Sequence, residues 1–319
     1  MTFNDNARLD TSQVRGGRSG GGMGRGAMIG GGGLGSLLLL VLFMFFGGNI
    51  GGGGGGGGQL PQNPPPGQAL NPFDTKQVEM GGDLNADLGN RCKTGADANR
   101  YDDCRVIGTV NSVQAYWEKK LPEATNGQLK YTDTLTTLYQ GSTPSACGTA
   151  SNQVGPFYCP RDKGIYIDAS FFSILSKNFG ADGGPLAQMY VVAHEYGHAL
   201  QDQLGLLERA QRDPQGASSG AVRVELMADC LAGMWAKDAA TTQDDAGNTL
   251  IKPLTQADIE SALSAAEAVG DDHIQKKSGM RVNPDGFTHG TSQQRMQWFM
   301  NGYRYGDLNR CNTFNTRAL

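Results

Sequence analysis

The chain has 319 residues, 48 of them glycine, with a formal net charge of −4 at pH 7 and a pI near 5.6. This slight acidity, and the lack of a basic stripe with interleaved aromatic residues, argue against a general nucleic-acid-binding protein. More than half of the glycines lie in the first 82 residues, so the rest of the chain must supply the core, and it suffices for one globular domain.

The N-terminal region has a composition typical of disorder. Residues 1–26 are polar and Gly-rich, and few of their side chains can pack. Their positive charge comes from four arginines, Arg8, Arg15, Arg18 and Arg25. We predict a disordered basic arm over residues 1–26.

An uncharged segment follows at residues 27–50 and contains the apolar run Leu34–Phe46. The run alone is short for a membrane span, but the whole uncharged segment is long enough for a helix to cross. A cleaved signal peptide would need a small-residue A-x-A site after the run, and none follows. A buried helix is disfavoured because the run is apolar on all sides and flanked by Gly tracts. We therefore predict a single transmembrane helix, with a signal peptide and a buried helix as the alternatives.

Charge asymmetry predicts how this segment would be oriented. The arginines precede it, whereas the next cation after it is Lys76, so the N-terminus is expected to be cytoplasmic. The chain beyond the span would then be periplasmic or extracellular. Residues 51–74 join a Gly tract to a Pro-rich stretch and predict a linker, which leads to a domain at residues 75–319.

All six cysteines follow the predicted span, and an even number fits an exported, disulfide-bonded domain. Six cysteines allow 15 pairings, among which the sequence does not choose. Two local pairs would leave the third as a long-range link, in the set Cys92–Cys104, Cys147–Cys159 and Cys230–Cys311. A zinc site built from cysteines is the rival interpretation, but no C-x-x-C spacing supports it.

Helices and strands are expected to alternate in the exported domain. Val110–Leu121 has the apolar spacing of an amphipathic helix, and a helix is also expected at Ser292–Tyr305. Leu129–Tyr139 and Gly164–Asp168 have strand composition. If Gly164–Asp168 were an edge strand, it could pair with an extended peptide, but it could equally be a central strand.

The motif His194-Glu195-Tyr196-Gly197-His198 lies in Gln188–Leu200, an apolar segment without proline that predicts a helix. Two His at i and i+4 lie about 40° apart around a helix and roughly 6 Å apart along it, so both rings can reach one metal ion. Glu195 stands beside this pair and is placed to act as general base on an activated water rather than as a ligand.

A catalytic zinc site needs a third protein ligand. Val222–Asp238 is also expected to be helical, and it carries Glu225 and Asp229 among apolar neighbours, where an unpaired carboxylate would be costly to bury. We predict Glu225 as the third ligand. Asp229 is predicted to accept a hydrogen bond from the Nδ1–H of a ligand His and so fix its orientation.

His289 is the remaining catalytic candidate. A hydrogen-bond donor opposite the metal would stabilise the transition-state oxygen of peptide hydrolysis, and His289 or Arg295 could provide it. The alternative is that His289 only braces the start of the helix that follows it.

These motifs together resemble a known family. H-E-Y-G-H, E-L-M-A-D, C-G…G-P-F-Y-C-P…Y-I-D and H-G-T-S-Q-Q-R are similar to the "putative neutral zinc metallopeptidase" family of bacterial membrane-anchored proteins, over about residues 75–319. The resemblance implies a gluzincin-like site with His194, His198 and Glu225 as ligands and Glu195 as base, and it favours a role for the His289 segment. A His commonly follows the second ligand in this family, whereas this chain has Ala199, which points away from the ligands.

We therefore expect an α+β fold: a zincin-like metallopeptidase domain with active-site helices and a small sheet, preceded by the disordered arm and the transmembrane helix. Zn²⁺ would be its cofactor and a peptide or protein its substrate, with Glu195 passing a proton from water to the leaving amine. The rivals are a zinc-stabilised envelope binding or scaffold module without catalysis, and a zinc hydrolase of envelope amides other than peptides. The intact Glu195 favours an enzyme over a scaffold.

Overall fold

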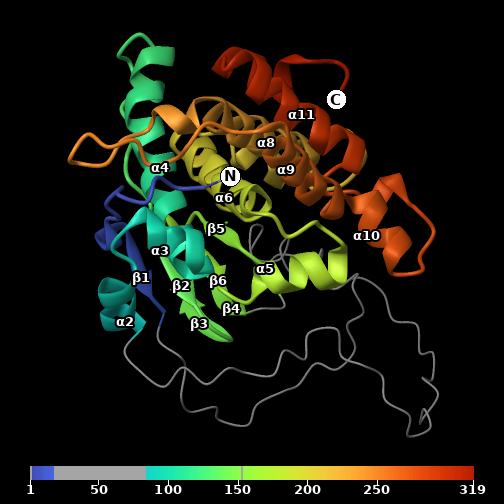
Figure 1. The fold of residues 1–319 in the computed structure, drawn as a ribbon. Coiled ribbons are helices and arrows are strands. Elements are labelled where there is room, and N and C mark those ends of the chain that lie inside the picture. The colour runs from blue at the N-terminus through green and yellow to red at the C-terminus, as the bar shows by residue number, and fades with distance from the viewer. Residues whose placement is uncertain (1, 18–83, 152–153) are drawn as a thin grey trace, which may run out of the picture.

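A small sheet and a thicker layer of helices make up the residues that the computed structural model describes, which are 2–17, 84–151 and 154–319 (Figure 1). The α-helices are α2 (Leu84–Arg91), α3 (Gly95–Arg100), α4 (Asp102–Ala124), α5 (Phe171–Ile174), α6 (Pro185–Gln203), α7 (Glu208–Arg212), α8 (Gly220–Asp238), α9 (Gln256–Ala268), α10 (Asp271–Lys277) and α11 (Ser292–Tyr305). Shorter turns are η1 (Thr11–Gln13), the π-helix η2 (Leu175–Phe179), η3 (Ala239–Thr241), η4 (Pro284–Gly286), η5 (Leu308–Cys311) and η6 (Thr313–Asn315).

The main sheet has the strand order β1-β2-β6-β5. The first three of these strands run parallel, and β5 is antiparallel to β6. The strands are β1 (Val14–Gly16), β2 (Leu135–Tyr139), β5 (Phe157–Cys159) and β6 (Gly164–Asp168), and β3 (Ser142–Ser145) and β4 (Gly148–Ser151) form a separate hairpin. Gly164–Asp168 is therefore a central strand, and β5 is the edge strand that contacts α6.

The helices predicted within the domain lie where the sequence expected them, although α4 is about twice as long as predicted. Val110–Leu121 lies inside the longer α4, and Ser292–Tyr305 is α11. The strand predicted at Leu129–Tyr139 begins only at Leu135.

Helices α6 and α8 pack against each other in the domain, and local features fix where each helix begins and how closely the two approach. Pro185 occupies the first turn of α6, where its missing N–H costs nothing, and the Ser219 side chain accepts the N–H of Val222 at the start of α8. At the crossing, a Cβ added to Gly197 would lie 3.0 Å from the Cα of Ala228. Glycine within the histidine motif thus lets α8 approach closely enough to bring its carboxylates to the α6 histidines.

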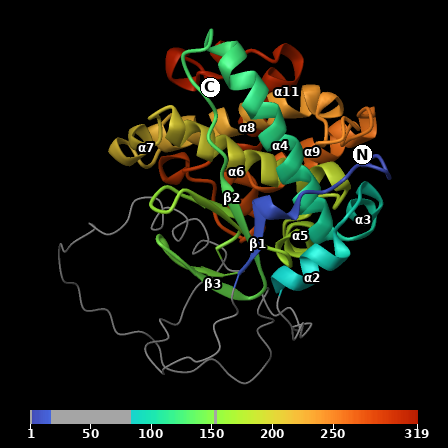
Figure 2. The same ribbon diagram turned by 90° about the vertical axis from the view of Figure 1, so that its left-hand side faces the viewer.

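The N-terminal residues are part of this domain. Strand β1 pairs in parallel with β2 (Figure 2). Phe3 forms an isolated bridge with Ile251. Phe3, Ala7 and Val14 are buried in the main core. The predicted disordered arm over residues 1–26 is therefore wrong for residues 2–17, because these few apolar side chains find partners in segments far along the chain.

The predicted fold class is wrong in its membrane part, although the mixture of helices and sheet is as expected. No helix among the described residues is long and apolar enough to cross a membrane, and residues 27–50 lie outside the described residues. The packing of β1 against β2 also opposes the prediction. A single crossing at residues 27–50 would place residues 2–17 and the domain on opposite sides of the membrane, yet the two parts pack together.

Three disulfides join all six cysteines: Cys92–Cys104, Cys147–Cys159 and Cys230–Cys311. The first two close short loops, and the third ties α8 to the end of η5 across 81 residues of sequence. Of the pairings that the sequence left open, this is the set with two local links and one long-range link.

Candidate metal centre

The two motif histidines lie one turn apart on α6 and face the same side of it. His194 is 6% exposed and His198 2% exposed, and their ring centroids are 4.7 Å apart. Both rings are thus held away from bulk solvent at the centre of the domain.

Helix α8 brings Glu225 to both rings. Its Oε2 lies 3.1 Å from Nε2 of His194, and its Oε1 lies 3.4 Å from Nε2 of His198. Ligand atoms about 2.0 to 2.1 Å from a tetrahedral zinc are about 3.4 Å apart. A carboxylate at these separations from the two imidazole nitrogens therefore fits Zn²⁺, and nitrogen and carboxylate oxygen are donors that zinc takes in proteins.

Each histidine is oriented by an acceptor behind its ring. Nδ1 of His194 lies 2.8 Å from Oδ1 of Asp229, the contact predicted from the sequence. Nδ1 of His198 lies 2.8 Å from Oε1 of Gln201, whose amide in turn donates to the carbonyl of Val224. If each Nδ1 carries the proton, each Nε2 keeps its lone pair for a metal. Sequence analysis missed Gln201, and its spacing three residues after His198 is the signal that could have found it.

Arg295, the other donor considered in the sequence, lines the smaller cavity and also holds Asp229. From α11, its Nε and Nη2 donate to the two carboxylate oxygens of Asp229, each over 2.9 Å. Tyr190 also donates to Oδ1 of Asp229. Arg295 is 3% exposed, so its charge is used to hold a buried carboxylate.

Burial and neighbouring charges shift the pKa values of the carboxylates at this site in opposite directions. Burial by itself would raise the pKa of Glu225, but the nearby His289, His198 and His194 hold it well below its usual range. The pKa of Asp229 is likewise lowered by Arg295 and His194 against the effect of burial. Glu195 differs, because burial raises its pKa more than the two histidines lower it.

His289 lies opposite these residues, on the loop before α11. It faces the two cavities that Glu225 and His198 also line. Asp271 fixes the loop, since its Oδ2 accepts the backbone N–H groups of Thr288, His289 and Gly290 over 2.7, 2.7 and 2.9 Å. Oδ1 of Asp271 lies 3.4 Å from Nδ1 of His289. The structure therefore brings His289 to the site, and Asp271, which the sequence did not single out, holds it there.

Two cavities meet at the metal centre. One, of about 120 Å³, is lined by Glu195 and His194 and by apolar side chains from α5, η2 and α10. The other, of about 330 Å³, is lined by Asp202 and by residues of α7 and α8. His198 and Glu225 line both, so a substrate could extend to either side of the metal position.

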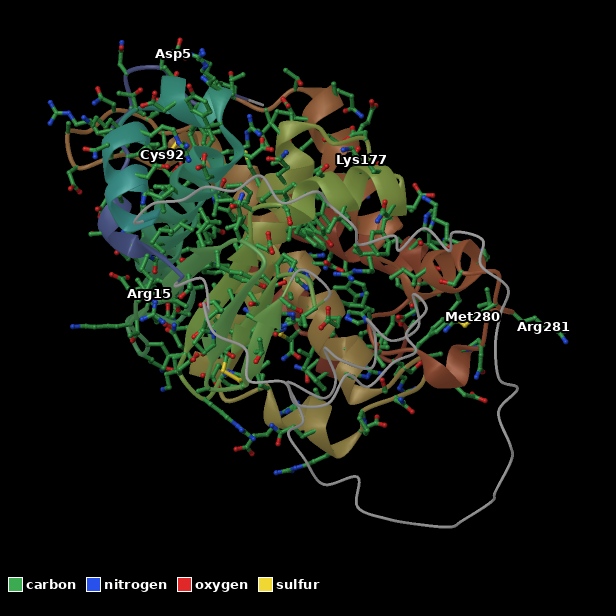
Figure 3. All side chains as sticks on the ribbon, turned by 90° about the horizontal axis from the view of Figure 1, so that it is seen from below. Asp5, Arg15, Cys92, Lys177, Met280 and Arg281 are labelled. Atoms are coloured by element: carbon green, nitrogen blue, oxygen red, sulfur yellow. A yellow bond between two sulfur atoms is a disulfide. The ribbon has the colours of Figure 1, made fainter. Side chains whose placement is uncertain are left out.

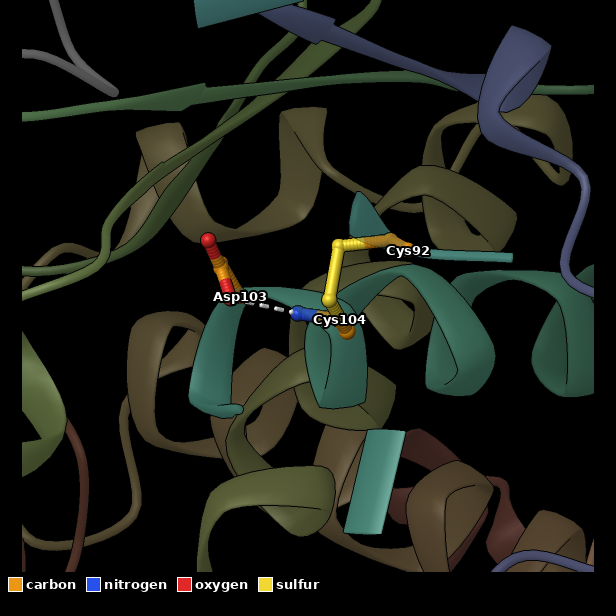
Figure 4. Close-up of side chains that lie close together, drawn as sticks. All are labelled: Cys92, Asp103 and Cys104. Carbon is orange, nitrogen blue, oxygen red and sulfur yellow. Dashed lines mark hydrogen bonds between the residues drawn. A yellow bond between two sulfur atoms is a disulfide. The ribbon is translucent and has the colours of Figure 1, made fainter. Parts of the chain in front are cut away.

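A second group of possible ligand atoms does not form a metal site. Cys92, Asp103 and Cys104 lie together, but the two sulfurs are bonded to each other (Figure 4). Asp103 accepts the backbone N–H of Cys104 and pairs with Arg91. With its thiolates in a disulfide and its carboxylate paired, this cluster has no ligands to offer.

Comparison with known proteins assigns the domain to a family. Residues 3–314 match the model of the family described as "Putative neutral zinc metallopeptidase". The chain is 48% identical over 258 residues to the uncharacterized protein Rv2575 of Mycobacterium tuberculosis, covering 80% of this chain and 84% of the relative. It is 44% identical over 184 residues to the uncharacterized protein YpfJ of Escherichia coli, covering 56% of this chain and 60% of the relative. No solved structure matches the chain significantly.

Proposed function

Because the chain belongs to the family described as "Putative neutral zinc metallopeptidase", we propose that it is a zinc-dependent hydrolase of peptide bonds. The observation that carries the proposal is the convergence of ligand atoms from His194, His198 and Glu225 within 4.8 Å of one another. Glu195 lies beside them without serving as a ligand, which is the position of a general base.

Each residue then has a distinct role. His194, His198 and Glu225 would hold Zn²⁺, which supplies a Lewis acid that polarises the scissile carbonyl and activates a water. Glu195 would accept a proton from the attacking water on its carboxylate and deliver it to the leaving amine. Burial raises the pKa of Glu195, which suits a carboxylate that must carry a proton between two steps. His289 donates to the oxygen that gains negative charge in the transition state.

The edge strand β5 offers a place for the substrate backbone. Pro156, just before β5, lines the smaller cavity, and Pro160, just after it, lines the larger one. On α6, Val191 lines the smaller cavity and Asp202 the larger, with the motif histidines between them. A peptide added to the edge of β5 would thus cross the metal position and extend from one cavity to the other.

The proposed place of action is an oxidising compartment outside the cytoplasm. All six cysteines are paired, and disulfides persist in exported proteins. No other described feature bears on this compartment, so the proposal rests on the disulfides.

The test compares three forms of the full chain: wild type, His198→Ala and Glu195→Gln. Mass spectrometry should find about one zinc per wild-type chain and little in His198→Ala. The wild type should cleave members of a peptide library. Glu195→Gln should keep its zinc but cleave the same peptides about 10²- to 10⁴-fold more slowly. Full activity in Glu195→Gln would remove Glu195 as the base. Zinc without any cleavage would favour the scaffold alternative.

A further inference from the structure

An apolar cavity adjoins the catalytic side of the metal centre. We propose that it receives a large apolar side chain of the substrate next to the scissile bond and so makes the enzyme selective for peptides that carry one. This inference rests on the proposed peptidase function and adds a substrate class to it.

The walls of the cavity are apolar on every side except the metal centre. Phe171 comes from α5, Phe179 from η2, Val191 from α6, and Val269 and Ile274 from the end of α9 and from α10. The charged or titratable residues among the described lining are those of the metal centre, His289 and the buried Tyr190. A charged substrate side chain entering here would lose its hydration without gaining a partner of its own.

The cavity adjoins the reacting groups directly. Val191 precedes Glu195 by four residues on α6, so the two side chains lie on the same face of the helix, one turn apart. Glu195 lines the same cavity as Val191. A side chain in this cavity therefore belongs to a residue beside the bond that Glu195 helps to cleave.

The far wall is held in a fixed position. The Nε2 of His273 on α10 donates to the carbonyl of Phe179 over 3.0 Å, which ties η2 to α10. Leu175 and Phe179 of η2 face inward, whereas Lys177 lies at the surface (Figure 3). A ligand binds more tightly to a preformed apolar cavity of this kind than to one that must first open, because no free energy is spent on opening it.

The size of the cavity fits one large side chain. Its volume is about 120 Å³. For comparison, an engineered apolar cavity of about 150 Å³ binds benzene. The space on the other side of the metal position has about 330 Å³ and includes Asp202, Glu208 and Gln211 in its lining. The two sides thus differ, and only the smaller one selects by apolar size.

In the experiment, the substitution Ile274→Phe on α10 places a larger side chain in the cavity. Zinc content and thermal unfolding would show that the variant folds, and Val269→Phe would fill the same space if it does not. The matched control is Leu263→Phe on α9, because Leu263 faces a different surface hollow beside Met296 and Met300. Wild type and variants would be compared on a peptide library, with cleavage sites determined by mass spectrometry.

We expect the wild type to prefer Phe, Leu or Met on one side of the cleaved bond. Ile274→Phe should lower the ratio of kcat/KM for these substrates to kcat/KM for substrates with Ala at that position by at least about tenfold. Leu263→Phe should keep the wild-type preference. A second readout needs no cleavage: benzamide should raise the Tm of the wild type but not that of Ile274→Phe, and acetamide should raise neither.

The outcomes separate this inference from the proposed function. Wild-type protein that cleaves no peptide overturns the peptidase proposal, and the inference with it. Cleavage without an apolar preference, an apolar preference that Ile274→Phe leaves unchanged, or a wild-type Tm that benzamide does not move overturns the inference alone.

Discussion

Asp229 is the most informative residue to change, because it couples the stability of the domain to the metal centre. It is fully buried and accepts hydrogen bonds from Tyr190 and from both donor atoms of Arg295. It also lies 2.8 Å from Nδ1 of His194. Asp229→Asn keeps the shape of the side chain, but it removes the negative charge and turns an amide toward the Arg295 guanidinium.

The expected loss of stability follows from leaving Arg295 buried without the carboxylate to which its Nε and Nη2 donate. Breaking a buried ion pair by removing one partner costs about 3 to 5 kcal/mol. For a domain of this size, about 2 to 4 °C of Tm is lost per kcal/mol, so the Tm should fall by about 6 to 20 °C. Zinc affinity should fall by about 10- to 100-fold, because the acceptor that orients His194 is weakened.

A double variant separates these two effects. In Asp229→Asn with Arg295→Met both charges are gone, and a buried pair replaced as a whole is often close to neutral for stability. Thermal unfolding should therefore recover most of the lost Tm, while zinc titration should show no recovery of affinity. The reasoning is refuted if Asp229→Asn unfolds within about 1 °C of the wild type, or if the double variant is no more stable than Asp229→Asn alone.

Two further predictions concern the proton on His194 and the N-terminal residues. Despite burial, Asp229 and Glu225 raise the pKa of His194 to about 9 in the metal-free protein, so zinc binding at pH 7 must displace about one proton and zinc affinity should rise with pH up to about 9. Calorimetry in buffers of different ionisation enthalpy measures this proton, and an affinity unchanged between pH 6 and 8 would contradict the prediction. Phe3→Ala should lower the free energy of unfolding by about 3 to 5 kcal/mol, because Phe3 is 1% exposed, whereas Ser12→Ala at an exposed position should change it by less than about 0.5 kcal/mol. A small effect of Phe3→Ala in urea unfolding would mean that residues 2–17 do not stabilise the domain.

The residues around the metal could be found from the sequence because helical spacing carries that information. His194 and His198 are four residues apart on α6, and Glu225 and Asp229 are four residues apart on α8, so each pair shares a face whatever the rest of the fold does. The embedding of both carboxylates in an apolar helix indicated that they needed partners inside the domain. The structure places these four side chains together as that reasoning expected.

The residues that hold the site from a distance could not be found in this way. Asp271 acts by accepting three backbone N–H groups of the loop that carries His289, and no local pattern announces such a contact. Arg295 was considered as a donor to the substrate, but it reaches Asp229 because α11 packs on α8. Such roles depend on which helices become neighbours, and that is decided by the whole core.

The N-terminal residues show a second limit of sequence patterns. Strand β1 has three residues and pairs with β2, which lies more than a hundred residues later in the chain. In residues 2–17 only a few separated apolar side chains are buried, among them Phe3 and Val14. Such spacing matches neither a helix nor a strand period, so composition alone favoured disorder.

The balance of charge explains why a divalent cation suits this site. Three carboxylates, those of Glu195, Glu225 and Asp229, are buried around a single buried arginine, Arg295. With all three ionised, the group carries two negative charges in excess, and excess charge in a low-dielectric interior is costly. In the metal-free protein His194, whose pKa is raised to about 9 by Asp229 and Glu225 despite burial, offsets part of this excess with a proton. A divalent ion would replace that proton and balance the site. Arg295 lies 3.5 Å from Nε2 of His194 and 3.8 Å from Oε2 of Glu225, so it helps to set the charge that the metal must bring.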